Sequence, residues 1–183
     1  MKIRKYIKKY LFFLISLVLL AILFIVNVDL GIKAISSVGY GLREVAIILP
    51  PIFILLGLLD VWVSREKMIR FMGEGSGIKG VAIAIILGSV AAGPLYAAFP
   101  IAAMFMKKGA KLSNILIFIG AWSTTKIPML LFEISSLGAK FALLRLAIDI
   151  PGIIIIAYAI YALLSKKEID GIYKRVENMD KLK

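Results

Sequence analysis

Long apolar runs dominate this sequence, and they limit the folds that the chain can adopt. Five of them approach or exceed the ~20 residues that a helix needs to cross a hydrocarbon core ~30 Å thick: residues 11–28, 44–63, 81–106, 113–132 and 142–163. Hydrophobic residues make up 61% of the 183 positions, well above the ~45–50% of soluble domains. The sequence therefore predicts an all-α, polytopic membrane protein with four to five transmembrane helices, forming a single membrane domain over residues 1–183.

Every proline of the chain lies inside an apolar run. These prolines are Pro50, Pro51, Pro94, Pro100, Pro128 and Pro151. A proline in a spanning helix frees a carbonyl, and irregular backbone at membrane depth survives only where it faces protein or a cavity. Gly93-Pro94 divides the third run into pieces of ~18 Å each, 81–92 and 95–106. Pieces of this length predict a broken helix that re-enters the membrane as a hairpin. The alternative is a full span with a kink.

The basic residues help to choose between these arrangements. If the third run re-enters and the other four span, 18 basic residues lie in the cytoplasm and three, Lys33, Arg43 and Lys140, lie outside. If all five runs span, the two sides carry 10 and 11, a balance that also fits dual insertion and an antiparallel dimer. Cytoplasmic segments carry an excess of Lys and Arg. The count favours the hairpin, with a cytoplasmic N-terminus and a charged cytoplasmic tail over residues 164–183, in the cytoplasmic (inner) membrane.

The composition also excludes several kinds of functional site. Cys and His are absent, which removes disulfides and the usual zinc ligands, so we expect no metal or cofactor. The net charge of +12 comes from basic residues at the ends of apolar runs, where they indicate topology and contact with the lipid bilayer, not with nucleic acid. Ser76 and Ser89 have no His to activate them, and no HExxH, GxSxG or Walker pattern occurs. We therefore do not expect an enzyme.

One charged residue lies deep inside an apolar run. Lys126 follows Ser123, Thr124 and Thr125 and precedes Pro128. A charge at the bilayer centre costs about 2.5–3.5 kcal/mol unless it is paired or hydrated. A cation among hydroxyl groups suits an anion or a polar solute with acceptor oxygens, and Pro128 would expose carbonyls beside it. The alternative is that Lys126 pairs with a carboxylate of another helix.

Three more ionisable residues, Glu133, Arg145 and Asp149, are candidates for an ion pair or for coupling transport to a second ion. Glu133 and Asp149 are the possible partners of Lys126. Arg145 and Asp149 are four residues apart and can pair on one helix face. Glu133 lies near the end of its run, which favours a solvated or interfacial carboxylate. Asp149 is the better coupling candidate, because we expect Pro151 to break the helix just after it.

The stretch Gly93–Pro100 provides a second half of the candidate site. A turn at Gly93-Pro94 followed by a half-helix presents backbone N–H groups, and their dipole favours an anionic ligand. Tyr96 adds a hydroxyl group close to this turn, and Pro100 marks a second interruption. The small residues Ala84, Gly88 and Ala92 recur every four positions and predict a face that packs closely against another helix.

The blocks Gly93-Pro94-Leu-Tyr96-Ala-Ala-Phe-Pro100 and Ala121-Trp122-Ser-Thr-Thr-Lys126-Ile-Pro128, followed by Glu133, resemble a known family. They are similar to the predicted permeases that include the organoarsenical exporters (the ArsP/YraQ type), over about Pro50 to Gly152. The resemblance implies a permease. Full-length members carry two related halves, and this chain resembles the second half, which implies a homodimer or pairing with a second half-permease.

One departure from the family pattern limits the substrate. The arsenic-handling branch is associated with a cysteine-bearing motif, and this chain has no Cys. Trivalent arsenicals prefer thiolate ligands, so the resemblance does not imply arsenic transport. The sequence predicts a half-sized permease, a secondary transporter of a small polar or anionic solute that works as a dimer. The alternative is a non-transporting membrane subunit or assembly factor of a larger complex.

Overall fold

The computed structural model describes residues 2–91 and 93–178, and every regular element in these ranges is helical. Two compact units, Met1–Pro51 and Ile52–Lys183, make up the chain. Within the described residues, three stretches are long and apolar enough to cross a membrane, or four if one bent helix pair is counted as a span. The three stretches are Val28–Leu55, Leu112–Leu137 and Ala139–Leu163. The predicted all-α polytopic membrane fold is confirmed.

The first unit contains helix α1 (Lys2–Val26) and the beginning of α2 (Val28–Trp62). Asn27 separates them, because its side-chain oxygen accepts the N–H of Leu30 at 3.1 Å and so caps the start of α2. The predicted run 44–63 lies largely in the C-terminal part of α2, and the apolar stretch of this helix already begins at Val28. Helix α2 continues through Pro50 and Pro51, so these two prolines do not break it.

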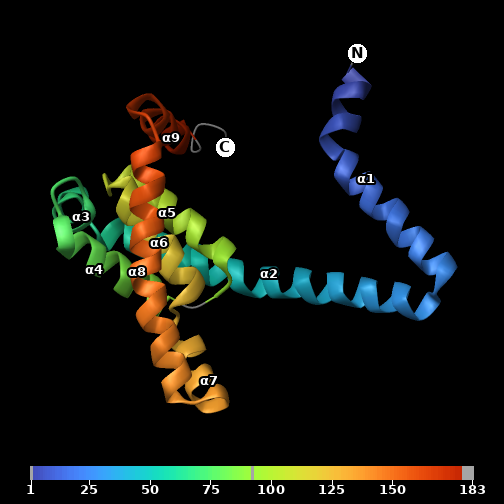
Figure 1. Cartoon of the computed structure of the whole chain (residues 1–183). Helices are drawn as coiled ribbons and strands as arrows, with labels where there is room; N and C mark the ends of the chain where they lie inside the picture. Colours follow the sequence, from blue (N-terminus) through green and yellow to red (C-terminus); the bar gives the residue numbers. More distant parts are fainter. Residues whose placement is uncertain (1, 92, 179–183) are drawn as a thin grey trace. The chain divides into compact units, whose positions relative to one another are not determined.

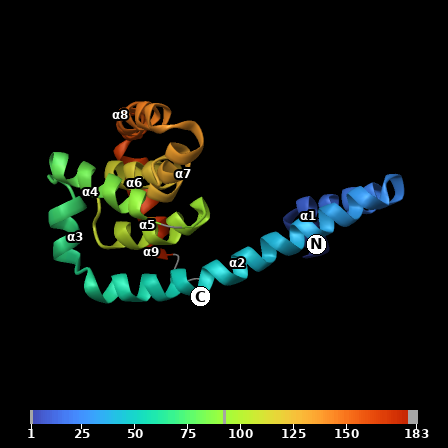
Figure 2. The same ribbon diagram turned by 90° about the horizontal axis from the view of Figure 1, so that it is seen from below.

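The second unit is a helical bundle. Its further elements are α3 (Arg65–Met72), α4 (Gly77–Val90), the 3-10 turn η1 (Leu95–Ala97), α5 (Ala98–Lys107), α6 (Leu112–Thr124), α7 (Ile127–Leu137), α8 (Ala139–Leu163) and α9 (Lys166–Asn178). Helix α6 lies at the centre and packs against α4, α5 and α8 (Figures 1 and 2). The ring of Phe118 meets Phe105 and Trp122 edge to face, with centroids 5.4 and 5.6 Å apart.

Helices α4 and α6 approach each other closely along a line of small residues. Gly80, Ala84 and Gly88 recur every four positions and are all buried. A Cβ atom on Gly88 would lie 2.6 Å from the carbonyl oxygen of Phe118, so no larger residue fits there without movement of the backbone. The predicted packing face is confirmed at Ala84 and Gly88. The third predicted member, Ala92, lies outside the described residues.

The third apolar run forms a hairpin. The carbonyl oxygen of Met72, just before α4, accepts the N–H of Lys111, just after α5, at 2.8 Å. The chain between them therefore leaves one end of the bundle and returns to the same end, and the turn lies at Gly93-Pro94. Helix α4 has 14 residues, which corresponds to ~21 Å. The predicted broken helix at Gly93-Pro94 is confirmed, and it is not the kinked full span that was the alternative.

Helix α8 corrects one prediction about the prolines. It continues without interruption from Ala139 to Leu163, although Pro151 lies inside it. Pro151 removes a single hydrogen bond, while tight packing holds the helix in line on α6. A Cβ on Gly120 of α6 would lie 2.8 Å from the side chain of Ile153. Asp149 therefore lies in a regular helix and not beside a break.

The C-terminal helix α9 packs on the bundle, as expected for an amphipathic surface helix. Ser165 and Glu168 form a capping box at its start: the Glu168 carboxylate accepts the Ser165 N–H at 2.8 Å, and the Ser165 hydroxyl oxygen accepts the Glu168 N–H at 3.3 Å. Ile172 and Val176 line an apolar groove together with residues of α5 and α6. The end of the predicted tail, residues 179–183, lies outside the described residues.

Candidate functional site

The turn of the α4–α5 hairpin points a backbone carbonyl at α6. Gly93 has φ +106°, in the region that favours glycine. Pro94 is extended and leads into η1. The Gly93 carbonyl oxygen accepts the indole N–H of Trp122 at 3.3 Å and also accepts a hydrogen bond from the Lys126 ammonium group. The two stretches that the sequence singled out, Gly93–Pro100 and Ser123–Pro128, therefore touch at these residues.

A second interruption, between α6 and α7, lies at the same level. Helix α6 has 13 residues and α7 has 11, so the break falls near the middle of the Leu112–Leu137 stretch. Pro128 lies in the first turn of α7, where its missing N–H costs little. Lys126 occupies the N-cap position of α7, and no side chain caps this helix start by a hydrogen bond.

The hydroxyl groups before the break are used locally. Thr124 and Thr125 donate to the carbonyls of Gly120 and Ala121, each at 3.0 Å. Thr125 is buried, and its hydroxyl group also lies 2.7 Å from that of Ser89 on α4. Bonds of this type satisfy carbonyls of the preceding turn. The contact between Thr125 and Ser89 thus connects α4 to the end of α6. The hydroxyl groups of Thr124 and Thr125 chiefly stabilise the interruption between α6 and α7.

Arg145 of α8 gathers two carboxylates and the end of α6. Its Nε donates to Glu133 at 2.7 Å, and its Nη1 donates to Asp149 at 2.8 Å and to the carbonyl oxygen of Thr124 at 2.9 Å. The ion pair expected between Arg145 and Asp149 is confirmed. The ion pairs of Glu133 and Asp149 within the described residues are thus with Arg145, while Lys126 binds a backbone carbonyl.

We call this group the break cluster: Gly93, Thr124, Lys126, Glu133, Arg145 and Asp149. It combines two cations with two carboxylates where two interrupted helical segments meet. Its ionised side chains are largely shielded: the exposed fraction is 21% for Arg145, 8% for Glu133 and 24% for Asp149. Arg145 and Lys126 satisfy the carbonyls that the two interruptions expose, which is what irregular backbone at membrane depth requires.

Other predicted residues lie outside the break cluster. Tyr96 on η1 and Ser123 on α6 are exposed, and neither is hydrogen-bonded to the cluster in the part of the chain that the structure describes. The second interruption predicted at Pro100 is wrong: Pro100 lies in the first turn of α5, where its missing N–H costs little, and lines the groove under α9. Pro128 is exposed and contributes through the backbone of the break.

Sequence reasoning missed two features of the cluster. Glu133 was expected to be solvated or to lie at the membrane–water interface. It is buried instead, because it packs in the α7–α8 hairpin against Arg145. The pairing of these two residues had a signal in the sequence. Gly138, whose φ of +87° makes the tight turn, lies between them at a similar number of residues from each. Residues placed in this way face each other across a helical hairpin.

A second group of polar residues lies at the end of the bundle where the α4–α5 hairpin begins and ends. We call it the end cluster: Glu74, Ala110, Lys111, Tyr161 and Tyr173. Lys111 is 3.0 Å from Glu74, and Tyr161 also donates to Glu74, at 3.3 Å. Tyr173 of α9 donates to the carbonyl oxygen of Ala110 at 2.7 Å. These contacts bring together parts of three basic stretches, each of which carries three or four Lys and Arg residues: 64–80, 107–112 and 164–178.

The end cluster carries the clearest pKa shifts near this surface. The Glu74 carboxylate raises the pKa of Lys111, chiefly because it accepts a hydrogen bond from the ammonium group. Burial raises the pKa of Tyr173 to about 12, and the charge of Glu74 adds to this effect. Both groups therefore keep their proton at neutral pH.

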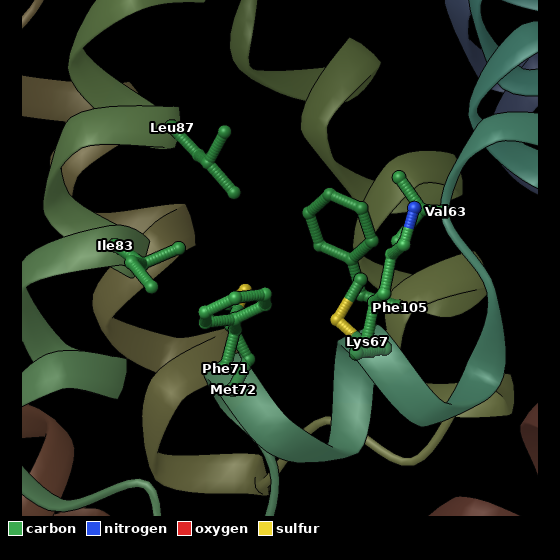
Figure 3. A pocket seen from close by; sticks show the side chains of 8 residues that line it. Val63, Lys67, Phe71, Met72, Ile83, Leu87 and Phe105 are labelled. Atoms are coloured by element: carbon green, nitrogen blue, oxygen red, sulfur yellow. The ribbon is translucent and has the colours of Figure 1, made fainter.

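An apolar pocket lies beside the amphipathic helix α3. Its volume is about 310 Å³, and Lys67 is the only charged residue among those that line it. The side chains that face it come from Val63, just after α2, and from α3, α4 and α5 (Figure 3): Phe71, Met72, Ile83, Leu87 and Phe105. It has no polar wall that could orient a polar solute, so we do not place the candidate site there.

Comparison with protein families identifies a family to which most of the chain is similar. Residues 32–183 match the model of a family described as predicted permeases. The match covers α5, the break and both helices of the α7–α8 hairpin. No curated protein and no solved structure matches the chain.

Proposed function

This chain belongs to that family of predicted permeases, and we propose that it moves a small polar or anionic solute across the membrane by binding it at the break cluster. The contact between Lys126 and the Gly93 carbonyl carries this proposal, because it joins two interrupted helical segments at one level of the bundle. Discontinuous helices that meet near the midplane are how many secondary transporters build their binding sites.

The chemistry of the break suits an acceptor-rich ligand. Lys126 carries three N–H donors and gives one of them to Gly93. The N-terminus of α7 has no side-chain cap and lies directly after Lys126, so its backbone N–H groups and its dipole add to the attraction for an anion. A solute that replaces the Gly93 carbonyl as the partner of Lys126 would also loosen the hairpin turn. Binding and movement of the hairpin are thereby linked.

The transport that we propose is secondary, and the working unit is a homodimer or a pair with a second half-permease. We propose that the chain lies in the cytoplasmic (inner) membrane with its N-terminus in the cytoplasm. We place the end of the bundle at which the α4–α5 hairpin begins and ends on the cytoplasmic side as well. The end cluster supports this placement, because parts of three basic stretches meet there and positive residues favour the cytoplasm.

The test is solute flux through the purified protein in vesicles, with Lys126→Gln as the central variant. Currents on solid-supported membranes report nitrate, sulfate, phosphate and small carboxylates, and vesicle swelling reports neutral polar solutes. We expect at least one solute to be transported, and Lys126→Gln to reduce its flux at least about tenfold through loss of a charge-assisted contact. Lys140→Gln is the matched control, because Lys140 is exposed beside the α7–α8 turn.

Two outcomes would count against the proposal. A folded Lys126→Gln protein with wild-type flux would remove the break cluster as the binding site. If correctly folded wild-type protein transports no solute of the series, the alternative gains support, namely a non-transporting membrane subunit or assembly factor. In that case Lys126→Gln should change partner retention or stability only.

A further inference from the structure

We infer that Glu133 is a proton-coupling group, which takes up one proton when an anion binds at Lys126. This inference rests on the proposed function and adds the coupled ion and the residue that carries it. It starts from the charges of the break cluster, which the structure brings together from α7, α8 and the break itself.

Charge balance is the first step of the argument. The cluster holds two cations, Lys126 and Arg145, and two carboxylates, Glu133 and Asp149, so its net charge is zero when all four are ionised. An added monovalent anion leaves one uncompensated negative charge, which is costly in a region of low dielectric. One proton from the aqueous phase, bonded to a carboxylate oxygen, restores neutrality. No other bond forms or breaks covalently, and anion and proton move together in a 1:1 ratio.

Burial selects Glu133 as the acceptor of this proton. Its side chain is 8% exposed, against 24% for Asp149, so an unbalanced charge costs more at Glu133. Asp149 also shares its donor, Arg145 Nη1, with the carbonyl of Thr124 and so belongs to the cap of α6. Within the described residues, the hydrogen bond that holds Glu133 comes from Arg145 Nε. Protonation of Glu133 therefore removes one ionic contact and leaves the cap in place.

The surroundings of Glu133 allow its charge to respond to Lys126. On α8 the charged groups that face it are Arg145 and, through Arg145, Asp149. Helix α6 contains no ionisable residue. Lys126 is the N-cap residue of α7, seven residues before Glu133 and ~10 Å from it along the helix axis. At this separation the change of one charge shifts a protonation equilibrium about tenfold.

Arg145 provides the link from proton to anion. Its Nη2 is buried and has no hydrogen-bond partner among the described residues. When Glu133 is neutral, the guanidinium group keeps its full charge while losing one anionic partner. The unused donor at Nη2 and the ammonium group of Lys126 then both attract an oxyanion to the break, from α8 and from the start of α7.

The test needs no transported solute, because removal of the Lys126 charge imitates an added anion. We expect Lys126→Gln to move the protonation of Glu133 to a pH about one unit higher, followed in infrared difference spectra over a pH series through the C=O band of the protonated carboxyl group. The band should vanish in Lys126→Gln/Glu133→Gln and persist in Lys126→Gln/Asp149→Asn. Lys126→Arg, which keeps the charge, and Lys140→Gln, on the exposed turn, should resemble the wild type.

The outcomes separate this inference from the proposed function. A C=O band that appears at the same pH in folded Lys126→Gln protein and in the wild type overturns the coupling role of Glu133, whatever the flux assay gives. A band that is lost with Asp149→Asn in place of Glu133→Gln moves the role to Asp149 and also overturns it. If Lys126→Gln does not fold, Lys126→Met replaces it, because its unbranched apolar side chain preserves the packing of the lysine stem. A flux defect of Lys126→Gln without this shift of the band leaves an anion site that is not coupled through Glu133.

Discussion

The break cluster and the end cluster use the same kinds of side chains with different consequences. Both join a cation to carboxylates on neighbouring elements. In the end cluster, Glu74 is 71% exposed and Lys111 is 24% exposed, so water solvates part of this ion pair. In the break cluster, Arg145 and Glu133 are 21% and 8% exposed. A charge near the surface can lose its partner cheaply, whereas a shielded one cannot. The break cluster is therefore where binding or protonation can drive a change of structure.

The largest effect should follow from Arg145→Gln. This change leaves Glu133 and Asp149 without their cation and the Thr124 carbonyl with a weaker donor. Loss of one partner from a buried pair costs about 3–5 kcal/mol, and the partial exposure of Arg145 places the cost near the lower value. We expect the apparent Tm in detergent to fall by about 6–12 °C. Arg145→Gln combined with Glu133→Gln should recover part of the loss, and an unchanged Tm of the single variant would refute the central role of Arg145.

A smaller effect should follow from Tyr173→Phe, which removes the hydrogen bond to Ala110 that holds α9. Such a bond contributes about 1 kcal/mol. Amide hydrogen exchange over α9 should therefore become about fivefold faster, while the α6–α8 core stays protected. If α9 exchanges at the wild-type rate, the apolar contacts of Ile172 and Val176 hold it alone.

The same tyrosine provides a pH dependence. Burial raises the pKa of Tyr173 to about 12 in the folded protein, above its ordinary value of about 10. A raised pKa gives stability that is present in full below pH ~10 and is lost as the pH rises toward ~12, because only the unfolded form then ionises readily. Exchange over α9 should accelerate in this window in the wild type, and the Phe variant should lack the tyrosine contribution.

The smallest effect should follow from Glu74→Gln. An exposed ion pair contributes about 0–1 kcal/mol, so we expect the apparent Tm to change by about 4 °C or less. The pKa of Lys111 should fall back toward its ordinary value, because the Glu74 carboxylate is the main cause of its elevation. Isotope-edited NMR of lysine side chains measures this shift. A loss of stability as large as that of Arg145→Gln would abolish the distinction between the two clusters.

The prolines show which helix interruptions can be predicted from the sequence near each residue. Six prolines in apolar runs predicted irregular helices, and Pro94 and Pro128 do lie at interruptions. Helices α2 and α8 nevertheless continue through Pro50, Pro51 and Pro151. Residue type alone does not distinguish these cases. Where a glycine at positive φ turns the chain, or a side chain such as Arg145 satisfies the exposed carbonyl, an interruption is stable. Helix α8 packs closely against Gly120 of α6 at Ile153, two residues after Pro151, and continues without interruption.

The sequence alone predicts the all-helical membrane fold from the length of its apolar runs and the break at Gly93-Pro94 from turn chemistry. It also identifies Lys126 as a candidate site residue, because a charge inside a membrane is costly. These are properties of short stretches of chain, so they can be read without a structure. The partner of Lys126, the burial of Glu133 and the three contacts of Arg145 depend on residues far apart in the chain. They arise only when α4, α6, α7 and α8 pack at one level, since an ionised group takes whichever donor or acceptor the packing leaves closest.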